Sequence, residues 1–405
     1  MREMGDRSVY VCHQTSGNYP TCEILEINLR QLLACRCRCR HGDIEMDTNI
    51  KIDGDDEFRC SSCELNKTEM RRVAWRGGPD NNPNVAGFMG CGVYNSRIIV
   101  GGGLLPDLKE KSSFKTECSD ALYEFRPINR RFCKRKKQKQ PLTLPSRRGQ
   151  PLLFEWRDRL YALYGAPRSI YSLSQNYFVK GAAFDFYDAK LKTWIPLPRP
   201  PKPDYPHKSY AIFDDKLYVQ SCHTGVFCFD LVTNQWSQQP ISLAEAFVCE
   251  GKIIALPFGS DYVLIGYGGY ATGGLFATYF SRATATILGS QHLRITLPLN
   301  CEASPCHLVD LGDGNICFFA SIQRDSNSNS PSPSPSYYDI YMVKFKVEIL
   351  PRHHWSYDDV VDDVSNQFLR ITVLATRIFQ FDIHHFNLTN NPTGVFGHTI
   401  GCFVL

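Results

Sequence analysis

The chain lacks a strong excess of charge of either sign. Its 45 basic and 41 acidic residues give a formal net charge of +4 over 405 residues. Proteins that bind nucleic acid along a surface usually carry a larger positive excess that is concentrated on one face. The composition therefore predicts that nucleic acid is not a partner.

Long apolar runs are also missing. A helix that spans a bilayer needs about 18 or more apolar residues in a row, and the most apolar region, 256–280, is interrupted by Gly, Pro, Asp and Ser. Residues 1–7 carry four charges and no apolar core follows them, so a secretory signal is not expected there. We expect no membrane contact and a cytoplasmic or nuclear location.

The 17 cysteines do not form the pattern of a disulfide framework. Their number is odd and no secretory signal accompanies them, whereas disulfide-rich domains are typically secreted. Cys228, Cys317 and Cys402 fall inside apolar runs, where a thiol behaves as a small buried hydrophobe. A reducing compartment is therefore expected.

Aromatic residues are abundant, with 25 Phe, 20 Tyr and 5 Trp. Hydrophobic residues make up 43% of the chain and charged residues 21%, which is a globular composition. Aromatic and β-branched residues pack well on pleated, half-buried surfaces. We therefore predict an all-β fold.

A short phrase recurs along the chain, in which a basic residue precedes alternating apolar and aromatic residues. It occupies residues 97–100, 159–162, 216–219 and 252–255. A phrase repeated every few dozen residues indicates one small sheet built several times, in which neighbouring copies bury each other's faces.

Two copies of the repeat are the clearest, and they lie in 151–198 and 210–236. Each reads as four short antiparallel strands. In each, the third strand ends at an aspartate, Asp188 or Asp230, and a tryptophan follows six positions later, at Trp194 or Trp236. We expect both indoles to pack between adjacent sheets.

Fainter copies flank these two. The N-terminal runs 8–11 and 24–29 look like second and third strands without a first, and 397–405 looks like a first strand without the rest. Pairing of the last strand with the first ones would complete that sheet and hide an exposed edge.

The order of strand, turn, Lys/Arg-Leu-Tyr-Val, glycines, Phe-Asp-Phe-Tyr-Asp and a spaced Trp resembles the kelch repeat. The chain looks like a plant-type kelch β-propeller of the galactose oxidase/kelch superfamily, over 91–345 closely and at the ends loosely. The glycines expected after the second strand are kept only at 101–103. The resemblance implies one domain, 1–405, of about six four-stranded blades (seven possible), closed by pairing of the terminal strands.

Two segments are expected to depart from the sheets. Residues 35–85 form a polar, cysteine-containing insertion, and residues 326–336, which alternate Ser, Asn and Pro, are expected to be disordered. Four cysteines of the insertion are weak candidates for a tetrahedral zinc site, with ordinary loop or strand cysteines as the alternative: Cys37, Cys39, Cys60 and Cys63. The basic run 134–139 is either a nuclear import signal or a solvated loop.

No catalytic constellation stands out, so the expected function is a non-enzymatic interaction module without a cofactor. The resemblance implies that loops on one propeller face bind a partner protein, as in substrate receptors of ubiquitin ligases, although no F-box-like or BTB-like segment is seen. The expected monomer would use rim residues chosen from loop positions: Arg147, Arg148, Tyr205, His207, Lys208 and His223.

The alternative is a metal-dependent enzyme on the same scaffold, of the oxidase or specifier-protein type. Specifier proteins use a Glu-x3-Asp-x3-Cys iron motif, and no Glu of this chain has an Asp four positions later.

Overall fold

The computed structural model describes residues 8–16, 21–29, 70–77, 85–87, 89–106, 114–129, 131–133, 142–165, 184–201, 207–221, 225–239, 250–268, 274–293, 307–323, 337–350, 368–382 and 396–405. In these residues the regular elements are β-strands and one short 3-10 turn, Pro127–Asn129. For these residues the prediction of an all-β fold is confirmed.

The strands form four-stranded antiparallel groups, here called sheets I to VI. Sheet I contains, in spatial order, β26 (Phe396–Val404), β1 (Ser8–Ser16), β2 (Thr21–Asn28) and β3 (Met70–Gly77). Sheet II contains β4 (Gly90–Tyr94), β5 (Arg97–Gly101), β8 (Leu122–Arg126) and β9 (Arg131–Cys133), with the hairpin β6 (Leu104–Pro106) and β7 (Phe114–Cys118) between β5 and β8 in the chain.

Sheets III and IV correspond to the two clearest sequence units. Sheet III contains β10 (Gly149–Trp156), β11 (Arg159–Gly165), β12 (Phe184–Asp188) and β13 (Thr193–Leu197). Sheet IV contains β14 (His207–Phe213), β15 (Lys216–Ser221), β16 (Gly225–Asp230) and β17 (Gln235–Gln238).

Sheets V and VI have longer strands. Sheet V contains β18 (Glu250–Phe258), β19 (Asp261–Tyr267), β20 (Leu275–Ser281) and β21 (Thr286–Leu293). Sheet VI contains β22 (His307–Gly312), β23 (Asn315–Gln323), β24 (Tyr337–Ile349) and β25 (Leu369–Asp382). A short parallel pairing of β14 with β18, at Ser209 with Gly251 and Tyr210 with Lys252, joins sheets IV and V.

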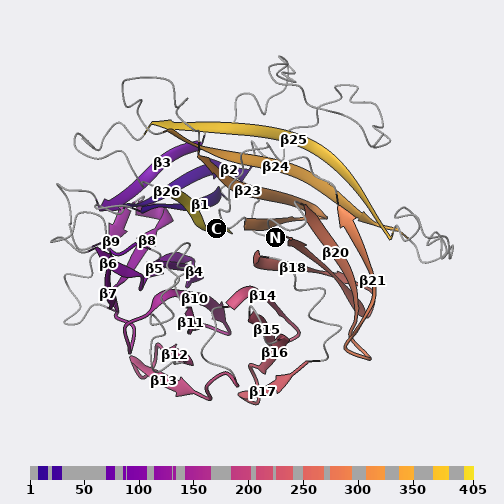
Figure 1. Cartoon of the computed structure of the whole chain (residues 1–405), viewed down its shortest axis with the longest axis horizontal. Helices are drawn as coiled ribbons and strands as arrows, with labels where there is room; N and C mark the ends of the chain where they lie inside the picture. Colours follow the sequence, from indigo (N-terminus) through magenta and orange to yellow (C-terminus); the bar gives the residue numbers. More distant parts are fainter. Residues whose placement is uncertain are drawn as a thin grey trace.

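The sheets lie around a common centre in a propeller-like arrangement (Figure 1). In sheets III, IV and V the first strands, β10, β14 and β18, lie nearest the centre, and β13, β17 and β21 lie at the periphery (Figure 1). This arrangement places the two faces of each sheet against its neighbours, which is how small sheets bury apolar surface when one sheet alone cannot.

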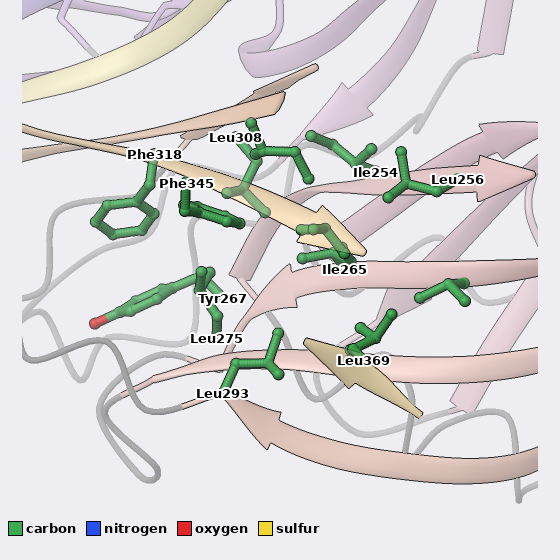
Figure 2. Close-up of a cluster of buried hydrophobic side chains, with 14 of the residues drawn as sticks. Ile254, Leu256, Ile265, Tyr267, Leu275, Leu293, Leu308, Phe318, Phe345 and Leu369 are labelled. Atoms are coloured by element: carbon green, nitrogen blue, oxygen red, sulfur yellow. The ribbon is translucent and has the colours of Figure 1, made fainter. Parts of the chain in front are cut away.

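The buried core is divided among the sheet interfaces. Six clusters of buried hydrophobic residues are found, and each combines residues of two consecutive sheets. Figure 2 shows the cluster between sheets V and VI, where Ile265 and Leu275 from one sheet face Phe318 and Phe345 from the other. Sheets VI and I share a cluster as well, in which Val11 of β1 packs with Phe319 of β23.

The two ends of the described chain meet in sheet I. Strand β26 pairs antiparallel with β1, placing Val404 opposite Val9 and Cys402 opposite Val11. The amide of Ser8 donates to the carbonyl of Leu405 at 2.9 Å, and the amide of Leu405 donates to the carbonyl of Ser8 at 3.1 Å. These contacts join the strands at the position where sheets II to V have a turn.

The aspartates that end the third strands organise the turns after them. The Asp188 carboxylate accepts hydrogen bonds from the amides of Lys190 and Leu191, at 2.8 and 3.0 Å. The Asp230 carboxylate accepts equivalent bonds from Val232 and Thr233, at 2.9 and 2.7 Å. Side-chain acceptors of this kind fix tight turns, so the shared sequence offset reflects a shared local structure.

The two tryptophans lie between adjacent sheets, as predicted. Trp194 packs against the cluster shared by sheets II and III, and its indole N–H donates to the carbonyl of Thr143 at 2.6 Å. Trp236 packs against the cluster shared by sheets III and IV, and its indole N–H donates to the carbonyl of Pro198 at 2.8 Å.

The aspartate turns predict a pH dependence of stability. The amide of Thr233 is the largest cause that lowers the pKa of Asp230, and burial opposes it. A carboxylate whose pKa is lower in the folded than in the unfolded chain stabilises the fold above its unfolded pKa of about 4, and the stabilisation is lost as the pH falls through the folded pKa. Asp230→Ala should therefore lower the melting temperature at pH 7, and its difference from the wild type should shrink below about pH 4. A difference that stays constant from pH 7 to pH 3 would contradict this explanation.

Part of the segment 35–85, which was predicted to be a polar insertion, forms a strand in the structure. Strand β3 lies within that range and is the outer strand of sheet I. Its arginines pair with buried glutamates of β2, Arg71 with Glu26 at 3.0 Å and Arg72 with Glu23 at 3.1 Å. Because arginines interrupt the alternation of apolar residues along β3, the sequence pattern did not predict this strand. Residues 35–69 and 78–84, like the segment 326–336, lie outside the described residues.

The recurring phrase does not occupy the same strand in every sheet. The phrase at 252–255 belongs to β18, a first strand, whereas the phrases at 97–100, 159–162 and 216–219 belong to second strands. The second strand of sheet V is β19, which follows the turn at Gly259. A basic residue before apolar ones is a common strand start and does not identify the strand's position in the sheet.

Candidate partner-binding face

The strand order places the connections between strands on two opposite faces of the propeller-like arrangement (Figure 1). Because each sheet is an antiparallel meander, the connections after first and third strands emerge on one side and those after second and fourth strands on the other. In sheets II to V the first-side connections are short, with two residues (95–96, 157–158, 214–215 and 259–260) or four residues (127–130, 189–192, 231–234 and 282–285). We call this side the short-turn face.

The opposite side is here called the loop-bearing face, and it receives longer stretches of chain. Connections from a fourth strand to the next first strand span residues 134–148, 198–206, 239–249, 294–306 and 383–395. Two connections from a second to a third strand span 166–183 and 324–336. Loops held by a rigid scaffold are the usual place for recognition residues.

One connection on the loop-bearing face is described in detail, at 142–148. The amide of Leu144 donates to the carbonyl of Asp120 at 2.8 Å, and the amide of Arg148 donates to the carbonyl of Ser119 at 3.1 Å. The carbonyl of Arg148 accepts from the amide of Gly103 at 2.7 Å. The connection is thereby fixed against the segments that leave and enter sheet II.

The glycine run 101–103 makes this contact possible. Gly102 and Gly103 have φ angles of +70° and +93°, a region that side chains strongly disfavour. A Cβ atom on Gly103 would lie 2.3 Å from the carbonyl oxygen of Gly87. The glycines therefore have a structural role after the second strand of sheet II.

Arg148 lies inside the molecule and not at the rim. It is 3% exposed, and its guanidinium donates to the carboxylate of Asp185 in β12 and, at 2.6 Å, to the carbonyl of Ala162 in β11. Burial lowers the pKa of Arg148, and the contact with Asp185 opposes that effect. Because its charge is used inside sheet III, we remove Arg148 from the residues proposed to bind a partner.

The structure describes the position of three of the other predicted rim residues. Arg147 is exposed beside the start of β10. His207 and Lys208 are the first residues of β14, where His207 is opposite Ser221, so they belong to a strand and not to a loop. All three are at the loop-bearing end of the first strands of sheets III and IV. Tyr205 and His223 lie outside the described residues.

Lys252 is a polar residue whose surroundings could not be predicted from the sequence. Lys252 of β18 is half-buried and is the register partner of Tyr210 in β14. Burial lowers the pKa of Lys252, whereas Asp310 of β22 and Cys402 of β26 raise it. The first strands of four sheets, β14, β18, β22 and β26, therefore contribute to the surroundings of Lys252. The arrangement of the sheets around a common centre brings these strands together (Figure 1).

The described residues contain no group of three or more His, Cys, Asp or Glu side chains that could hold a metal ion. The zinc candidates Cys37, Cys39, Cys60 and Cys63 lie outside the described part of the chain. Within the part that is described, no helix has the length and apolar character needed to cross a membrane.

Comparison of the sequence with known proteins gives one partial match, to a protein family. A family described as "protein of unknown function (DUF1668)" matches residues 134–240, which include sheets III and IV and are less than half of the chain. A search of curated proteins found no match.

Solved structures give distant likenesses. The chain is similar to YjhT, with 10% identity, 80% of this chain and 92% of that chain covered and a TM-score of 0.40. It is also similar to the hydrazine synthase of Kuenenia stuttgartiensis, with 11% identity, 71% and 75% covered and a TM-score of 0.35.

Proposed function

We propose that the chain is a closed, six-bladed, kelch-type propeller and acts as a non-enzymatic protein-interaction module. The proposal of a closed ring is supported by the β26–β1 pairing and by the clusters shared by consecutive sheets, the one between VI and I included. Its function is supported chiefly by the segregation of connections, with short turns on one face of sheets II to V and longer connections on the other.

The loop-bearing face is the proposed binding surface. Arg147, His207 and Lys208 mark its described edge at two adjacent sheets. Tyr205 and His223 remain candidates from the sequence. The exposed cationic side chain of Arg147, on a connection anchored to sheet II, suits the recognition of another protein. The proposed protein is monomeric, uses no cofactor and acts in the cytoplasm or nucleus.

The partner class is proposed from the resemblance to kelch propellers. Such propellers often present substrates to ubiquitin ligases, so a ligase-associated receptor is the specific form of the proposal.

Affinity capture tests the proposed surface. The tagged wild-type chain should retain a reproducible partner, including ligase scaffold subunits, and the double variant Arg147→Glu, Lys208→Glu should lose it. Arg370→Glu, an exposed position on the outer strand of sheet VI, is the matched control and should retain the partner. Equal recovery by all three proteins would remove the loop-bearing face from the proposal, and recovery of a partner without ligase subunits would remove the ligase role alone.

A further inference from the structure

Two buried cysteines meet at the contact between sheets I and II. Cys12 lies in β1 and is 0% exposed, and Cys91 lies in β4 and is 7% exposed. Both belong to the cluster of buried side chains that these two sheets share. The two side chains also share a hydrogen bond. Two sulfur atoms from different sheets are therefore in direct contact.

A glycine of the closing strand gives Cys91 the space to reach Cys12. Gly401 of β26 is the antiparallel register partner of Cys12, and directly opposite residues of paired strands point to the same face of the sheet. A Cβ atom on Gly401 would lie 3.2 Å from the Cβ of Cys91 and 2.8 Å from the ring of Phe403. Because Gly401 has no side chain, Cys91 packs beside Cys12 in its place.

The two thiols differ in how readily they ionise. Burial raises the pKa of both cysteines, so both are protonated at neutral pH. Their hydrogen bond raises the pKa of Cys12 further and lowers that of Cys91, as expected where Cys12 is the donor. The thiolate is the form that reacts with an oxidant. Cys91, which is also the more exposed of the two, is therefore the sulfur better placed to react first.

Two more cysteines lie near this pair. Cys22 of β2 and Cys402 of β26 both raise the pKa of Cys91. Among the described residues, however, no three side chains of the metal-ligating types are grouped so that they could hold a metal ion. The contact between Cys12 and Cys91 therefore suits a bond between two sulfur atoms and not a metal centre.

We propose that Cys12 and Cys91 form a reversible disulfide when the chain meets a peroxide, and that this bond is a redox-controlled cross-link between sheets I and II. The Cys91 sulfur attacks one oxygen of hydrogen peroxide, the O–O bond breaks, and a sulfenic acid forms with release of water. The Cys12 sulfur then attacks the Cys91 sulfur, the S–O bond breaks, and the oxygen leaves as a second water. Two thiols and one peroxide thus give one disulfide and two waters. A cellular thiol reverses the reaction by exchange.

The cross-link would act where the two ends of the described chain meet, because sheet I also contains β26. A disulfide between residues far apart in sequence restricts the unfolded chain and so stabilises the folded one. In the reducing compartment that the cysteine pattern predicts, the pair would remain as thiols, and exposure to a peroxide would form the bond. This inference does not depend on a partner at the loop-bearing face.

Peptide mass spectrometry tests the proposal directly. The reduced, folded full-length chain is treated with hydrogen peroxide, its remaining thiols are alkylated, and the digest is searched for disulfide-linked peptides. The peptides that contain Cys12 and Cys91 should be recovered linked to each other, with the loss of two hydrogen atoms. The same treatment of the chain unfolded in urea should give a mixture of pairs in which this link is no longer dominant.

Variants identify the two sulfur atoms. Cys12→Ala and Cys91→Ala should each remove the link, whereas Cys22→Ala, a buried position of the same cluster, should retain it. In the wild type and in Cys22→Ala, peroxide should raise the melting temperature by about 2–5 °C, and dithiothreitol should reverse the rise. Neither Cys12→Ala nor Cys91→Ala should show this rise.

Four results would overturn the proposal. The first two are the absence of a link between Cys12 and Cys91 after oxidation of the folded chain, and a link from Cys91 to Cys22 in its place. The third is a link that is equally abundant after oxidation of the unfolded chain, because the folded contact would then not direct it. The fourth is a reversible rise in melting temperature that persists in Cys12→Ala.

Discussion

Replacing Arg148 with methionine is expected to lower the free energy of unfolding by about 3–5 kcal/mol, because Asp185 would stay buried without its cationic partner. The two side chains are only 3% and 8% exposed, so water cannot replace the lost contact without opening sheet III. A loss of this size is a large part of the total stability of a domain, which is about 5–15 kcal/mol. Urea unfolding followed by tryptophan fluorescence measures it.

A double variant separates the ion pair from the packing around it. Arg148→Met, Asp185→Leu replaces both charges by apolar groups and should recover most of the lost stability, since apolar replacement of a buried pair is often neutral. Arg147→Met, one position earlier but exposed, should change stability by less than about 0.5 kcal/mol. If Arg148→Met behaved like Arg147→Met, Arg148 would not be buried as described.

Replacing Trp236 with alanine is expected to cost about 3 kcal/mol, the lower end of the range for large aromatic residues because the indole is half-buried. The ring contacts Phe229 of its own sheet and Phe184 of sheet III, with centroids 4.9 and 5.8 Å away. The variant also leaves the carbonyl of Pro198 without the indole donor.

Two further variants show which part of the indole matters. Trp236→Phe keeps an aromatic ring and removes the N–H donor, so it should cost about 1 kcal/mol. Trp194→Ala should cost about as much as Trp236→Ala, because both indoles pack between consecutive sheets and donate to a carbonyl outside their own sheet. A Trp236→Ala effect below about 1 kcal/mol would show that the ring does not stabilise the interface.

The sequence was most informative where structure is set by nearby residues. Asp188 and Asp230 accept bonds from amides two and three positions later, so their turns could be predicted from spacing. Trp194 and Trp236 follow these turns at a fixed distance along the chain, so their packing between adjacent sheets could be predicted as well. The all-β class followed from the same repeated units.

The sequence was least informative where a residue's environment depends on another sheet. Arg147 and Arg148 are adjacent and identical in type, yet one is exposed and the other is buried against Asp185, 37 positions away. Strand β3 was missed because Arg71 and Arg72 find glutamates on β2.

The outer strands β21 and β25 were missed as well. Their described side chains are mostly exposed or half-buried, and contacts between sheets hold them in place, as when Gln291 of β21 bonds to the backbone of Leu369 in β25.

The same distinction between nearby residues and other sheets applies to the candidate site. The idea that loops on one face bind a partner could be reached from the repeat, because an antiparallel meander sends alternate connections to opposite sides. The individual rim residues could not be predicted, because Arg148 is buried and because His207 and Lys208 lie in β14.

Hydrogen–deuterium exchange across β1 and β26 tests most directly whether the sheets form a closed ring. In the intact protein, amides of Phe396–Val404 should exchange slowly, at rates similar to those of Ser8–Ser16, because the two strands share a hydrogen-bonded ladder. Removal of residues 396–405 should then speed exchange in Ser8–Ser16. Fast exchange of Phe396–Val404 in the intact chain, with β22 to β25 still protected, would contradict the closed ring and the placement of the loop-bearing face.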